Sequence, residues 1–64
     1  MNKKEFQRFI KGARKAQGMT LRDFADELGV NWVTVWRWEK GRNCPAKDAM
    51  GYWVEKVIGI CETV

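Results

Sequence analysis

The stretch "TLRDFADELGVNWVTVWRWEKG", residues 20–41, contains two short amphipathic segments on either side of a glycine. The apolar residues of the first segment follow the i, i+3, i+4, i+7 spacing of one helix face, and they are Leu21, Phe24, Ala25 and Leu28. Thr20 with Asp23 three residues later is typical of a capping box, and Gly29 is typical of a helix end. The first segment therefore predicts a helix that begins after Thr20 and ends before Gly29.

The second segment predicts another helix directly after the first. Asn31 is a favoured N-cap residue, and Gly41 can close the helix because glycine adopts a left-handed conformation without steric cost. Only Gly29, Val30 and Asn31 separate the two helices. Two short helices joined by a glycine-containing turn of this length are typical of a helix-turn-helix motif, here over about residues 20–40.

The second helix of this motif has two chemically different faces. Val35 and Trp38 lie together on one side of a helical wheel, where we expect them to join the core. The opposite side carries Trp32, Val33, Trp36, Arg37 and Lys40. Because Trp32 and Trp36 are four residues apart, their indoles can stack on the surface, and such a patch is typical of a binding surface. The alternative is that a flanking helix or a second chain covers both indoles.

Two further helices are predicted, one on either side of the motif. The first covers about residues 3–17 and begins at Asn2 and Glu5, whose spacing is typical of a capping box. Its apolar stripe consists of Phe6, Phe9, Ile10 and Ala13. The last helix covers about residues 46–60, and its apolar residues span roughly half of the circumference, more than packing on one small core usually needs. This surplus predicts that a second copy of the chain packs on the last helix.

The size and composition of the chain limit its function. At 64 residues it is expected to be one small domain, residues 1–64, near the lower size limit for a core without metals or disulfides. Cys44 and Cys61 have no C-x-x-C spacing, so we expect no metal, no cofactor and a reduced, cytoplasmic chain. The sequence has no histidine, no serine and no long apolar run, so we expect neither an enzyme nor a membrane protein.

Positive charge is concentrated in two parts of the chain. The net charge is +4, from 12 Lys and Arg residues against 8 Asp and Glu residues. The basic residues gather in residues 1–15 and again in residues 37–47, whereas Asp23, Asp26 and Glu27 lie between these groups. Segregated positive charge suits a polyanion, whose phosphates release counterions on binding. The alternative is an ordinary solvated surface.

From Arg14 to Pro45 the sequence resembles the Cro/C1-type (XRE-like) helix-turn-helix repressors of phages and bacteria. The matching positions are Thr20, the pair Phe24 and Ala25, the turn Leu28, Gly29 and Val30, the inward Val35, and the ending Trp38, Glu39 and Gly41. The resemblance implies an all-α fold, a compact lambda-repressor-like domain of four to five helices. It also implies that the second helix of the motif enters the major groove of double-stranded DNA.

The resemblance also implies roles for individual positions. The residues that face base edges are Trp32, Val33, Trp36 and Arg37, and those that meet phosphates are Thr20, Asn31, Lys40, Arg42 and Asn43. Arg37 is the strongest candidate for direct readout, because a guanidinium can donate two hydrogen bonds to guanine. Arg14 and Glu39 match a pair that forms an internal salt bridge. The family often has polar residues at the three base-facing positions that are apolar in this chain.

The resulting hypothesis is a small homodimeric transcriptional regulator, a repressor or autorepressor that acts on a partly palindromic operator. Its dimer interface would lie on the last predicted helix, at Met50, Trp53, Val54, Val57 and Ile58. One alternative is a protein-interaction module of the antitoxin or antirepressor type that uses Trp32 and Trp36. Another is the binding of single-stranded nucleic acid by stacking on the same two indoles.

Overall fold

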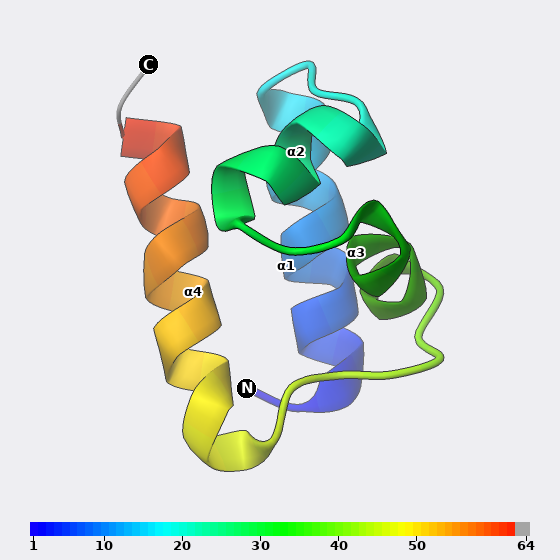
Figure 1. Cartoon of the computed structure of the whole chain (residues 1–64). Coiled ribbons are helices and arrows are strands. Elements are labelled where there is room, and N and C mark those ends of the chain that lie inside the picture. The colour runs from blue at the N-terminus through cyan, green and yellow to red at the C-terminus, as the bar shows by residue number, and fades with distance from the viewer. Residues whose placement is uncertain (63–64) are drawn as a thin grey trace.

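The computed structural model describes residues 1–62, and this part of the chain is all-α. Its four helices are α1 (Lys3–Ala16), α2 (Leu21–Leu28), α3 (Trp32–Glu39) and α4 (Lys47–Glu62). In Figure 1, α1 and α4 run side by side in the same direction, α2 lies across them near their carboxyl ends, and α3 packs beside α1. None of these four helices is long and apolar enough to cross a membrane. The predicted all-α class and the helix-turn-helix order are confirmed.

Side-chain caps fix where the first two helices begin. Asn2 Oδ1 accepts a hydrogen bond from the Glu5 amide at 2.8 Å, and Glu5 Oε1 accepts one from the Asn2 amide at 3.0 Å. This is the reciprocal capping box that the spacing predicts. At α2, Thr20 Oγ1 accepts from the Asp23 amide at 3.1 Å, but within residues 1–62 the return bond from the Thr20 amide is not formed. The predicted second capping box therefore has only the first of its two hydrogen bonds within residues 1–62. The aspartate side chain is one methylene shorter than glutamate, so its carboxylate does not reach the Thr20 amide.

The carboxyl end of α3 is closed by a turn that favours glycine. Gly41 has φ +72°, its amide donates to the Trp38 carbonyl at 3.2 Å, and the Arg42 amide donates to the Arg37 carbonyl at 3.0 Å. These paired bonds define a Schellman motif. A Cβ atom at position 41 would also lie 2.7 Å from Gln7 Oε1 on α1. The left-handed conformation favours glycine here, and a Cβ atom would also force the end of the Gln7 side chain to shift.

Trp38 is the residue through which α3 packs into the core. Its indole is only 5% exposed, and it makes edge-to-face contacts with Phe6 of α1 and Trp53 of α4, each with ring centroids 5.4 Å apart. Val35 is fully buried beside it. The predicted inward positions of α3 are thus confirmed. The buried apolar core of the described residues consists of Phe6, Ile10, Phe24, Ala25, Leu28, Val35, Trp38, Met50 and Val57.

An ion pair joins α1 to the end of α3. Arg14 Nε donates to Glu39 Oε2 at 2.7 Å, and Arg14 Nη2 donates to Glu39 Oε1 at 3.1 Å. The exposed fractions of the two side chains are 18% and 7%. A further guanidinium N–H bonds the Met19 carbonyl at 2.9 Å, just before α2. The hydrogen bonds to Glu39 raise the pKa of Arg14 above its ordinary value, so the guanidinium keeps its charge.

A lysine of α4 joins that helix to the turn of the motif. Lys56 Nζ donates a hydrogen bond to the Leu28 carbonyl at 3.2 Å, at the carboxyl end of α2. The same ammonium lies 5.7 Å from the ring centroid of Tyr52 and 5.8 Å from that of Trp53. A cation at this end of a helix opposes the partial negative charge of the last carbonyl groups.

Two residues predicted to form the dimer interface lie in the core of the single chain. Met50 is 6% exposed and Val57 is fully buried, because both lie on the side of α4 that packs against the other helices. Trp53 and Val54 are half-buried, and Ile58 is 42% exposed. Met50 and Val57 therefore offer little surface to a second chain, whereas the side chains of the other three residues still reach the surface. The interface itself stays a prediction.

Replacing Glu39 with alanine should lower the free energy of unfolding by about 3 to 5 kcal/mol, because the largely buried Arg14 charge loses its partner. Urea denaturation followed by far-UV circular dichroism measures this change. The matched control is Glu27→Ala, which removes an exposed carboxylate from α2 and should change the free energy by less than about 0.5 kcal/mol. Equal denaturation midpoints for the two variants would contradict the role assigned to the ion pair.

Candidate nucleic-acid interface

The outward face of α3 carries the four residues that were predicted to meet base edges. Trp32 is 40% exposed and Arg37 is exposed, whereas Val33 and Trp36 are half-buried. All four come from one helix of eight residues, whose other face holds the buried Trp38. The face is therefore presented by a short element that is fixed from behind by the core.

Trp36 contacts a cation rather than another indole. The ring contacts found within residues 1–62 do not include one between Trp32 and Trp36, so the stack that the sequence allowed is not formed. Instead, Arg42 Cζ lies over the Trp36 ring, 5.5 Å from its centroid. The Schellman turn explains this contact, because it directs the chain after Gly41 back along the last turn of α3.

Three of the predicted phosphate-contacting residues use their side-chain oxygens locally. Thr20 Oγ1 accepts from the Asp23 amide, Asn31 Oδ1 accepts from the Val33 amide at 2.9 Å, and Asn43 Oδ1 accepts from the Cys44 amide at 2.9 Å. Thr20, Asn31 and Asn43 are all exposed. What each side chain still offers to solvent is a donor, a hydroxyl hydrogen or an amide NH2 group. Donors of this kind match phosphate oxygens.

The carboxyl end of α3 carries a group of free positive charges. Arg37, Lys40 and Arg42 are exposed, and within residues 1–62 none of them forms an ion pair. The adjacent acid, Glu39, is buried and both of its oxygens are bonded to Arg14. The negative charge nearest in sequence is thus neutralised internally. The three cations remain available to a polyanion, and their position also suits the carboxyl end of a helix.

The structure adds two basic residues that sequence reasoning did not assign to this surface. Lys11 of α1 lines a pocket of about 220 Å³ together with Trp36 and Lys40. Arg22 of α2 lines another of about 320 Å³ that also includes Trp32. Lys11 could have been found, because it lies one turn before Arg14 on α1, and Arg14 was expected to reach the end of α3. No comparable pattern pointed to Arg22.

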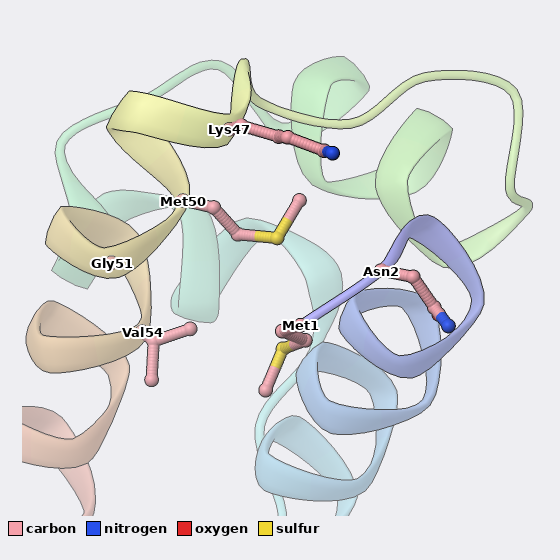
Figure 2. A pocket seen from close by; sticks show the side chains of 6 residues that line it. All are labelled: Met1, Asn2, Lys47, Met50, Gly51 and Val54. Carbon is pink, nitrogen blue, oxygen red and sulfur yellow. The ribbon is translucent and has the colours of Figure 1, made fainter.

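A third pocket lies elsewhere, between the first residues of the chain and the beginning of α4. It has a volume of about 640 Å³ and is lined by Met1, Asn2, Lys47, Met50, Gly51 and Val54. Figure 2 shows the Met50 side chain extending from α4 toward the first two residues. No residue of α3 lines this pocket, so it is separate from the outward face of α3. It does adjoin Val54, one of the predicted dimer residues.

Comparison with known families agrees with this arrangement. The family model described as helix-turn-helix matches residues 10–50, more than half of the chain. The matched segment contains the second half of α1, all of α2 and α3, and the beginning of α4. No significant similarity was found to curated proteins or to solved structures. The chain belongs to the Cro/C1-type helix-turn-helix family of DNA-binding regulators.

Proposed function

We propose that this protein is a sequence-specific regulator that binds double-stranded DNA as a homodimer and represses transcription from a partly palindromic operator, its own promoter included. The observation that carries the proposal is the outward face of α3. Trp32, Trp36 and Arg37 project from a helix that the core and the Arg14 ion pair hold in place. A rigid helix with an exposed basic end fits the major groove of duplex DNA.

Arg37 is the residue that we assign to base recognition. Its exposed guanidinium can donate two parallel hydrogen bonds to the O6 and N7 atoms of guanine. Val33 and Trp32 offer apolar surface, which suits thymine methyl groups and sugar edges. The phosphates beside the groove would meet Lys40 and Arg42 at one end of α3, and the exposed donors of Thr20, Asn31 and Asn43 around the motif.

A second copy of the chain would complete the binding unit. One recognition helix reads only a few base pairs, so useful specificity needs two copies about 34 Å apart. The surface for pairing is the exposed apolar part of α4, where Ile58 is 42% exposed and Tyr52 is 51% exposed. Repression would then require only that the dimer occupies its operator in the cytoplasm. Dimerisation makes that occupancy depend steeply on protein concentration, as autorepression requires.

The test of this function is selection of binding sites from random duplex DNA, followed by titration of the selected duplex at several salt concentrations. We expect a dyad-symmetric motif and an affinity that falls steeply with salt, because Lys and Arg contacts to phosphates release counterions. Salt-sensitive binding without any selected motif would remove the claim of sequence specificity.

Replacing Arg37 with alanine should weaken binding to the selected duplex by about 1 to 3 kcal/mol and relax one base preference in each half-site. Repeating the selection with the variant measures the preference directly. The matched control is Lys40→Ala, which removes an exposed charge from the same end of α3 and should weaken binding equally on all sequences. An equally uniform loss for Arg37→Ala would identify Arg37 as a phosphate contact instead.

Replacing Ile58 with aspartate should convert the homodimer into a folded monomer, because a charge then occupies the apolar surface of α4. Sedimentation measures the mass, and circular dichroism shows that the fold is kept. Glu27→Lys changes an exposed charge on α2 and should leave the mass unaltered. A folded Ile58→Asp variant with the mass of the wild type would place the interface elsewhere.

The exposed Trp32 also favours a second candidate, a protein-interaction module of the antitoxin or antirepressor type. Tryptophan is enriched among the residues that dominate protein interfaces. Under this alternative the outward indoles would bind another protein, and the chain would show no salt-dependent binding to any duplex. The same titration therefore separates the two functions.

A further inference from the structure

The contact between Trp36 and Arg42 gives this tryptophan a role that its chemistry alone does not indicate. We propose that Trp36 is a positioning residue, which holds the Arg42 guanidinium where it binds a phosphate of the DNA backbone. The inference rests on the proposed function, because it assigns the ligand of Arg42 to duplex DNA. It differs from the expected role of Trp36, which was direct contact with base edges.

Arg42 is held at both its main chain and its side chain. Its amide donates to the Arg37 carbonyl at 3.0 Å, within the turn that Gly41 allows through its φ of +72°. Its guanidinium carbon lies over the Trp36 ring at 5.5 Å from the centroid. The backbone bond sets where the side chain starts, and the indole sets where it ends. An arginine that would otherwise sample many rotamers is therefore aligned along the outer face of α3.

The contact of a guanidinium with an aromatic ring pairs its N–H donors with no oxygen acceptor. The attraction acts between the positive charge and the face of the indole, whereas the N–H groups of a guanidinium point outward in its own plane. Those N–H groups can form paired bonds to phosphate oxygens. Trp36 itself offers only a single N–H donor. Its contribution to phosphate binding thus acts through Arg42.

In the part of the chain that the structure describes, no carboxylate pairs with this guanidinium. Within residues 1–62 Arg42 forms no ion pair, and Glu39, the acid closest to it in the chain, is bonded to Arg14 through both oxygens. The attraction to the indole face brings no neutralising charge. Arg42 is therefore held in one place while its full charge remains available, which is the combination that a phosphate contact needs.

The same geometry connects the phosphate contact to base reading. Arg42 and Arg37 are joined by a backbone hydrogen bond, and Arg37 is the residue assigned to guanine. A phosphate held by Arg42 would fix the depth and register of the carboxyl end of α3 in the groove. Contacts to phosphates position a protein on DNA, and contacts to bases then specify the sequence. Trp36 would thus support readout without touching a base.

A double-mutant cycle on DNA affinity tests the proposal. The probe is a mixed-sequence duplex of about 30 base pairs, long enough for two half-sites, and it suffices because phosphate contacts do not depend on sequence. Trp36→Leu keeps an apolar side chain but removes the ring, and it should weaken binding roughly 2- to 10-fold by freeing the Arg42 side chain. In the Arg42→Ala background, the same change should alter the affinity by less than about 2-fold.

Two further variants separate positioning from general structure. Trp36→Phe keeps a ring under the guanidinium and should restore most of the affinity that Trp36→Leu loses. Trp32→Leu removes the other outward indole, which has no cation over it among the described residues, and its effect should be the same with Arg42 or Ala at position 42. Circular dichroism checks that all variants fold alike.

A measurement without DNA tests the contact itself. In the wild type and in Trp36→Phe, the side-chain protons of Arg42 should show an upfield ring-current shift by NMR, and this shift should vanish in Trp36→Leu. Absence of the shift in the wild type would overturn the proposal, as would an equal loss of affinity from Trp36→Leu in both Arg42 backgrounds. If the shift were present but the wild type bound no duplex, the proposed function would fail, and the role of Trp36 in it would fail as well.

Discussion

The architecture depends on one arginine that bonds three parts of the chain. Arg14 projects from α1, binds both carboxylate oxygens of Glu39 on α3, and donates to the Met19 carbonyl just before α2. Helix α3 has only eight residues, too few to be stable in isolation. Its orientation must therefore be imposed by its surroundings. The buried Trp38 side chain packs α3 against the core, and the hydrogen bonds of Arg14 fix the orientation of the helix.

The internal ion pair also determines the charge of the surface. Glu39 would be an acid in the middle of a basic region if it faced solvent, but it is 7% exposed and fully bonded. Among residues 1–62, the exposed cations around it are thereby left without an ion-pair partner. A single contact thus supports the fold and keeps the outward end of α3 positive. The stability of the motif and its electrostatic character depend on the same pair of residues.

Local patterns predicted the helices well, because caps and periodicity act within a few residues. Asn2, Thr20 and Asn31 begin helices as expected, and Val35 and Trp38 face the core. Features that depend on packing between helices were not predictable in the same way. A helical wheel shows that α4 has a wide apolar arc, but not which part of it the core uses, and only the structure shows that Met50 and Val57 are in that part. The contact of Trp36 with Arg42 likewise required the path of the turn.

The bond from Lys56 to the Leu28 carbonyl has a consequence for the geometry of a pair of chains. It ties α4 to the turn that immediately precedes α3. In the proposed homodimer, the helix that meets the second copy would also be the one that anchors this turn. The packing of α4 against the motif would then set the distance between the two α3 helices. In the proposed dimer this distance would match the helical repeat of DNA.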